Sequence, residues 1–83
     1  MTRNEIIEKL KQIMINSDEG NREKYKNASE SDNLATDLGF TSANILYMVI
    51  VIEEVFSIRF ENVNIADFQT LKDVVDYIED MKK

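Results

Sequence analysis

The chain has 83 residues, which suits one small domain, and we treat residues 1–83 as that domain. Acidic residues outnumber basic ones 16 to 10, and the net charge of −6 argues against binding to nucleic acid or insertion into anionic membranes while favouring basic protein surfaces as partners. The chain contains no cysteine and no histidine, so we expect no disulfide, no metal site and no catalytic residue.

The first predicted helix covers about residues 3–16. Thr2 and Glu5 have the spacing of a capping box, and apolar residues follow at three- and four-residue intervals. Charges interrupt residues 1–13, so this segment lacks the unbroken apolar stretch of a signal peptide, and the longest apolar run, residues 45–52, is too short to span a bilayer. We therefore expect a soluble cytoplasmic protein.

Residues 17–41 are predicted to form a long loop. They are rich in Asp, Glu, Asn, Ser and Lys, contain both glycines and show no sustained periodicity. A loop of this length needs anchors, and the candidates are Leu34, Leu38 and Phe40. We expect residues 18–31 to be mobile and residues 34–41 to pack against the helices.

The rest of the chain predicts two further long helices and one short one. Residues 42–56 are apolar and too long without a turn signal to be a strand, and Ser42 is the predicted N-cap. Residues 62–68 could form a short helical turn, and a last helix starts at Thr70. Its apolar positions are Leu71, Val74, Val75, Ile78 and Met81. The predicted fold is an all-α bundle of three main helices plus one short helix.

The helix over residues 42–56 has more apolar surface than one core needs. Glu53 and Glu54 mark its water-facing side. The predicted core positions opposite them are Ile45, Met48, Val51, Ile52, Val55 and Phe56. Other apolar residues fall beside the glutamates: Ala43, Leu46, Tyr47 and Ile50. Either the loop or the short helix covers these residues, or they form a docking face for a partner's groove with basic rims.

The turn before this helix suits a phosphate. Gly39 permits a sharp turn, and the Ser42 hydroxyl would lie next to unpaired backbone N–H groups at the helix N-terminus. A phosphodiester on Ser42 would be stabilised by those donors and by the helix dipole. A serine after a glycine turn is common, so this motif by itself does not decide the function.

Four sequence runs with their spacing resemble the acyl carrier protein family. They are LATDLGFTS at residues 34–42, IEEVF at 52–56, IRF at 58–60 and TLKDVVDYI at 70–78. The resemblance extends over the whole chain, with the first helix supported by pattern alone. It implies an acyl-carrier-like four-helix bundle that is not itself an enzyme.

The resemblance implies a covalent 4′-phosphopantetheine on Ser42, which aligns with the serine of the family's Asp-Ser-Leu motif. A phosphopantetheinyl transferase would install this group from coenzyme A with magnesium. Acyl, aminoacyl or peptidyl groups would then travel as thioesters between acyl-loading and acyl-using enzymes that recognise the second helix, with a monomer as the default state. The predicted partner-binding residues are Thr41, Ala43, Leu46, Tyr47, Ile50, Glu53 and Glu54.

The chain departs from the family's pattern around Ser42. Thr41 stands where the family usually has aspartate, Ala43 where it has leucine, and Asn44 and Tyr47 occupy positions that are often acidic. Because partner enzymes read this face partly through charge, we expect a dedicated carrier for a specialised pathway and do not assume the general fatty-acid machinery as its partner. Fatty acid biosynthesis and secondary metabolism both stay open as the pathway. The departures also leave open an unmodified carrier-fold protein that acts as an interaction module.

Overall fold

The computed structural model describes residues 1–60 and 67–82. In these residues the elements are α1 (Arg3–Ser17), the 3-10 turn η1 (Glu19–Asn21), α2 (Arg22–Lys26), α3 (Ser42–Phe56) and α4 (Leu71–Met81). The described part contains no strand beyond one isolated bridge between Asn33 and Thr70. The prediction of an all-α bundle is therefore confirmed. The short helical turn predicted at residues 62–68 falls mostly outside the described residues.

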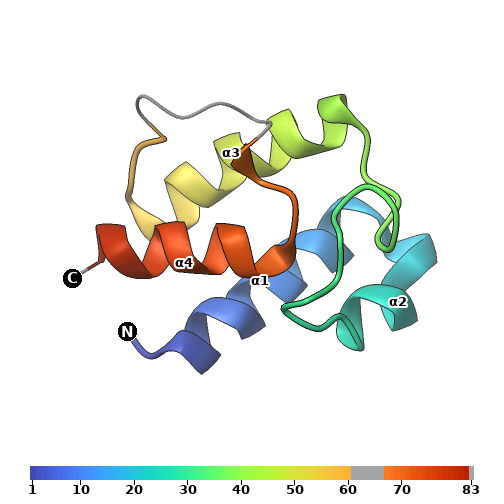
Figure 1. Cartoon of the computed structure of the whole chain (residues 1–83), viewed down its shortest axis with the longest axis horizontal. Coiled ribbons are helices and arrows are strands. Elements are labelled where there is room, and N and C mark those ends of the chain that lie inside the picture. The colour runs from blue at the N-terminus through green and yellow to red at the C-terminus, as the bar shows by residue number, and fades with distance from the viewer. Residues whose placement is uncertain (61–66, 83) are drawn as a thin grey trace.

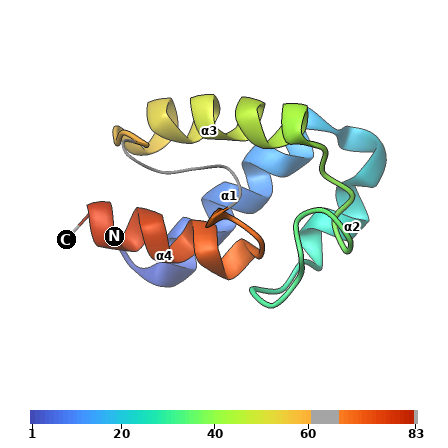
Figure 2. The ribbon, with the colours of Figure 1, turned by 45° about the horizontal axis from the view of Figure 1, so that its top comes forward.

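Helix α1 is the centre of the bundle and contacts α2, α3 and α4. Figure 1 shows α3 in green to yellow above α4 in red, with both termini at the same end of the molecule. In the turned view of Figure 2, α1 crosses obliquely between these two helices and reaches the N-terminal end of α3, where α2 also lies.

Each long helix begins at a threonine that closes a capping box. The side chains of Thr2, Thr41 and Thr70 each accept a hydrogen bond from the backbone N–H three residues later, and that residue's side chain accepts from the threonine N–H. Such reciprocal caps satisfy two of the donors that a helix start leaves unpaired. The box predicted at Thr2 is confirmed, and the same device fixes the starts of α3 and α4.

The core is one continuous apolar cluster along α1, α3 and α4. Among the described residues no polar or charged side chain is fully buried. The most deeply buried side chains of the three helices are Ile6, Leu10, Met14, Ile52, Phe56, Leu71, Val75 and Ile78. Most positions predicted to face the core are confirmed, but Val55 and Met81 are 44% and 45% exposed. Val55 is the second-last residue of α3, and Met81 is the last residue of α4.

The prediction of a loop without secondary structure is wrong for residues 18–31. These residues contain η1 and α2, and Tyr25 of α2 is 2% exposed. The Tyr25 ring lies 5.6 Å from the ring of Phe40, and its hydroxyl donates to Asp18 Oδ2 at 3.0 Å. The predicted anchors Leu34, Leu38 and Phe40 are confirmed as buried residues.

Candidate functional site

Ser42 is the first residue of α3, and Thr41 is its N-cap. The prediction that Ser42 caps the helix is therefore wrong by one residue. The reason is the residue three positions further on: Asn44 completes a capping box with Thr41, whereas Ile45 could not do so for Ser42. Thr41 Oγ1 accepts from Asn44 N at 3.2 Å, and Asn44 Oδ1 accepts from Thr41 N at 3.0 Å. Two of the residues that depart from the family's pattern thus act as a pair.

The one-residue shift leaves the Ser42 hydroxyl available. Its side chain is exposed and makes no hydrogen bond within the described residues. The N–H groups of Ser42 and Ala43 are also unpaired there, because the first turn's regular bonding starts with Ile45 N–H donating to Thr41 O at 3.0 Å. A phosphate on Ser42 would therefore fit beside two free donors at the positive end of the helix dipole.

The turn that leads into Ser42 is held by side-chain hydrogen bonds. Asn33 Oδ1 accepts from the N–H groups of Ala35 and Thr36, both at 2.9 Å, and Asp37 Oδ2 accepts from Asn33 N at 2.7 Å. Gly39 has a φ of 74°, which glycine adopts without strain. The start of α3 is thus fixed in position while the Ser42 side chain remains in solvent.

The outer face of α3 is uncovered in the described structure. Leu46, Tyr47 and Ile50 are 52%, 53% and 59% exposed, and Ala43 is exposed as well. The alternative that the loop covers these residues is therefore wrong. We call the exposed surface formed by Ala43, Leu46, Tyr47 and Ile50 the α3 face.

The two glutamates of α3 differ in their surroundings. Glu54 is exposed, but Glu53 is half-buried and accepts a hydrogen bond from Phe60 N at 2.9 Å. The prediction placed both on the water-facing side, since spacing along one helix says nothing about the segment that follows it. Glu53 therefore ties the chain after α3 to the helix. The α3 face consequently has little charge of its own, and no acidic residue lies in the first turn.

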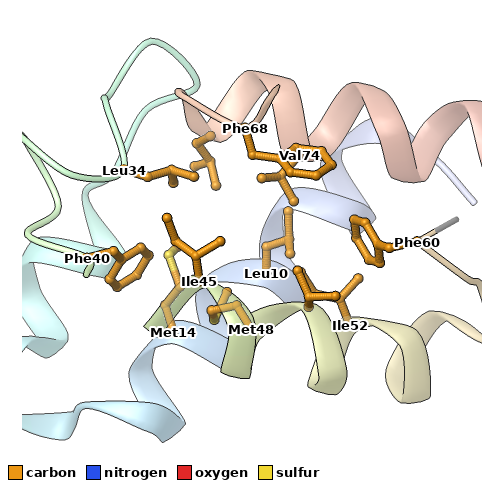
Figure 3. Close-up of a pocket in the computed structure, with 12 residues that line it drawn as sticks. Leu10, Met14, Leu34, Phe40, Ile45, Met48, Ile52, Phe60, Phe68 and Val74 are labelled. Atoms are coloured by element: carbon orange, nitrogen blue, oxygen red, sulfur yellow. The ribbon is translucent and has the colours of Figure 1, made fainter. Parts of the chain in front are cut away.

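A small apolar cavity lies between α1, α3 and α4, on the inner side of α3 (Figure 3). Its volume of about 20 Å³ is close to that of a single water molecule's site. The sequence analysis did not predict this cavity, because its wall joins side chains from distant parts of the chain. The lining residues are Leu10, Met14, Leu34, Phe40, Ile45, Met48, Val49, Ile52, Phe60, Phe68, Leu71 and Val74.

Three aromatic rings, those of Phe60, Phe68 and Tyr77, pack together beside the cavity. Phe60 stacks on Tyr77 with ring centroids 4.6 Å apart, and Phe68 packs edge-on against both rings. The Tyr77 hydroxyl donates to Arg59 O at 2.7 Å. These contacts connect α4 to the chain that follows α3, and Phe60 and Phe68 also line the cavity.

Comparison with known proteins agrees with this arrangement. The chain matches the family model for the phosphopantetheine attachment site over residues 24–78, a stretch that includes Ser42. It is 34% identical over 79 residues to the acyl carrier protein of Coprothermobacter proteolyticus, covering 95% of this chain and 93% of that protein. It is 31% identical over 78 residues to the acyl carrier protein of Phytoplasma australiense, covering 89% and 93%.

The class defined by the fold and the matched site is that of phosphopantetheine-attachment domains. Within that class, the chain belongs to the acyl carrier protein family. Its function is that of an acyl carrier, a protein that presents groups to enzymes. No helix in the described residues combines the length and apolar character needed to cross a membrane.

Proposed function

We propose that Ser42 carries a covalent 4′-phosphopantetheine arm, through which this protein holds acyl groups as thioesters. The observation that carries the proposal is the exposed, unpaired Ser42 hydroxyl beside two free N–H groups at the start of α3. The arm would supply the thiol that the cysteine-free sequence lacks. The groups it holds would be acyl, aminoacyl or peptidyl.

The attachment would be a transfer from coenzyme A catalysed by a phosphopantetheinyl transferase with magnesium. The Ser42 oxygen would form a bond to the β-phosphorus, 3′,5′-adenosine bisphosphate would leave, and the serine proton would go to the transferase or to water. The residues of this chain orient the nucleophile, because the Thr41–Asn44 capping box fixes the first turn of α3. The N–H groups of Ser42 and Ala43 would then face the new phosphodiester.

We further propose that the α3 face, together with Thr41, Glu53 and Glu54, is the surface that the transferase and the acyl-handling enzymes recognise. Its exposed side chains are mainly apolar, so most of the contact free energy would come from burying them. Glu53 would act through its bond to Phe60 N, which holds the chain beside the face. Such a surface fits enzymes of a specialised pathway better than enzymes that require a strongly acidic helix.

Intact-protein mass spectrometry tests the attachment. The apo protein is incubated with coenzyme A, magnesium and a panel of transferases, next to Ser42→Ala and the matched control Ser57→Ala. We expect one phosphopantetheine adduct on the wild type and on Ser57→Ala, and none on Ser42→Ala. An adduct that persists on Ser42→Ala would overturn the site. No adduct on any variant would favour the unmodified interaction module instead.

A further inference from the structure

A second hollow lies next to the cavity of Figure 3, with which it shares Phe40 and Met48, and it opens to solvent. It has a volume of about 290 Å³ and lies where the end of α1 and α2 approach α3. We call it the Asp18 groove, and its lining residues are Ser17, Asp18, Tyr25, Phe40, Asn44, Tyr47 and Met48. Tyr47 belongs both to this groove and to the α3 face. A partner resting on the α3 face would therefore also meet the groove.

The Asp18 carboxylate is held in a fixed orientation. Asn21 Nδ2 and the Tyr25 hydroxyl donate to its Oδ2 at 2.7 and 3.0 Å. Tyr25 is 2% exposed, so its ring is held by the surrounding core, whereas Asp18 itself is exposed. The hydrogen bond from Asn21, followed by that from Tyr25, lowers the pKa of Asp18 below its ordinary value, and both bonds favour the charged carboxylate. Neither of the two bonds uses Oδ1, which lies 3.6 Å from the Cβ position of Gly20, and a weaker backbone hydrogen bond from Gly20 also lowers the pKa of the carboxylate.

The charge of Asp18 matters because α3 has so little of its own. The first turn of α3 has no acidic residue, and Glu53 already accepts from Phe60 N. No ion pair involves Asp18 in the described residues. Lys24 is near enough to lower the pKa of Asp18 further, and its Nζ lies 3.8 Å from the Cβ position of Gly39. A cationic side chain of a partner protein would therefore meet an oriented carboxylate, for which Lys24 would compete.

We propose that the Asp18 groove receives an arginine side chain of the enzyme that docks on the α3 face, a proposal that rests on the carrier function proposed above. The arginine stem would lie on the apolar floor formed by Phe40 and Met48, and its planar guanidinium would stack on the Tyr47 ring and donate to Asp18 Oδ1. Lysine fits less well, because its ammonium is strongly hydrated and cannot stack. In this proposal the negative charge that the enzyme recognises is the Asp18 carboxylate at the end of α1, in place of acidic residues on α3.

A titration followed by nitrogen-15 NMR tests the groove without any partner enzyme. The probes are N-acetyl-arginine amide and its uncharged analogue N-acetyl-citrulline amide. We expect saturable shifts at Asp18, Asn44 and Tyr47 with the arginine probe alone. Asp18→Asn should weaken the binding of the arginine probe about two- to fivefold, the range of an exposed ion pair. The charge-matched control Glu8→Gln changes a carboxylate of α1 that does not line the groove, and it should leave this binding unchanged.

Two further variants protect the test against a folding artefact. Tyr47→Ser removes the stacking ring without touching Asp18, and we expect it to weaken the arginine probe as well. Lys24→Gln removes the competing cation and should tighten binding. Shifts spread equally over all exposed carboxylates, or the same affinity in Asp18→Asn as in the wild type, would overturn the groove.

The transferase assay separates the two proposals. If an adduct forms on Ser42 but the arginine probe finds no site, the groove fails and the carrier proposal stands. If no transferase acts but the probe binds as expected, the groove stands as an arginine site and its carrier role fails. Where an active transferase is found, Asp18→Asn should raise its KM at low salt about two- to fivefold with little change in kcat, and 0.5 M salt should remove the difference.

Discussion

Ser57 and Gly39 are the residues with positive φ in the described chain, and they lie near the two ends of α3. Ser57 has a φ of 57° and a ψ of 46°, and its N–H donates to Glu53 O to end the helix. The left-handed region costs a residue with a Cβ about 1–2 kcal/mol, while glycine adopts it freely. Serine at this position therefore carries strain that the fold tolerates.

Ser57→Gly should raise the free energy of unfolding by up to about 1 kcal/mol, because the relief of strain exceeds the extra entropy of the unfolded glycine chain. Gly39→Ala is the opposite case. It places a Cβ at a φ of 74° and should lower the free energy of unfolding by about 1–2 kcal/mol. Urea unfolding followed by circular dichroism measures both. The same sign for the two variants would contradict the assignment of strain.

At the scale of single residues, the sequence predicted which side chains are buried or exposed better than it predicted which residues cap a helix or form a given hydrogen bond. The separation of buried Met48 and Ile52 from exposed Leu46 and Ile50 follows from helical periodicity. The N-cap was misplaced, because Thr41 and Ser42 are both good capping residues and the choice depends on the partner three positions on. The bond that occupies Glu53 depends on tertiary structure and has no local signal.

At the scale of elements, the start of α3 depends on the Thr41 cap. Thr41→Ala should lower the free energy of unfolding by about 1 kcal/mol, since Asn44 N–H loses its acceptor at the helix start. Thr41→Asp supplies another capping oxygen and should leave stability nearly unchanged. Thermal unfolding of the two variants provides the measurement. Equal loss in both would mean that the threonine acts through something other than the cap.

Arg3 joins three parts of the chain near the N-terminus. Its guanidinium forms ion pairs with Glu30 of the loop and with Asp76 and Glu79 of α4, the last two at 2.7 and 3.1 Å. Lys72 Nζ also lies 2.8 Å from Asp76 Oδ2. These hydrogen bonds, first from Lys72 and then from Arg3, lower the pKa of Asp76. The network therefore makes the docking of α4 on α1 sensitive to acid.

The sign of that sensitivity follows from the lowered pKa. Because the folded-state pKa of Asp76 lies below its unfolded value near 3.8, its contribution to stability is present above that pH and is lost as the pH falls through the folded value. Asp76→Asn should therefore be less stable than the wild type at pH 7, and the difference between the two proteins should shrink as the pH falls below about 4. Melting temperatures from pH 7 to pH 3, with Glu8→Gln as control, test this. A deficit that stays constant over the range would argue against the ion pairs as its cause.

Helix α2 marks the limit of prediction at the element scale. It has five residues, which is shorter than the window over which helical periodicity can be recognised. Its position depends on Tyr25, which is buried against Phe40 and bonded to Asp18. The segment was predicted to be a loop because its composition is polar, yet a single aromatic anchor holds it to the bundle. The Asp18 groove could not be predicted for the same reason.

At the scale of the whole molecule, the chain keeps two kinds of apolar surface apart. Leu10 of α1 is fully buried and lines the cavity of Figure 3, where it meets side chains of α3 and α4. Ile50 of α3 is 59% exposed. The first surface stabilises the fold, and the second remains available to an enzyme. Substituting one residue from each surface should therefore separate stability from recognition.

Leu10→Ala should lower the free energy of unfolding by about 2–5 kcal/mol, the range for a buried leucine that leaves a cavity. Ile50→Ser should change it by less than about 0.5 kcal/mol, because an exposed side chain has little contact to lose. For a transferase that modifies Ser42, the larger effect on KM should come from the exposed residue and not from the buried one. Ile50→Ser should raise KM for the carrier several-fold, whereas Leu10→Ala should leave KM nearly unchanged at a temperature where it is folded. Urea unfolding measures the stability of both variants, and transferase kinetics measure their KM. If Ile50→Ser lost as much stability as Leu10→Ala, the α3 face would belong to the core.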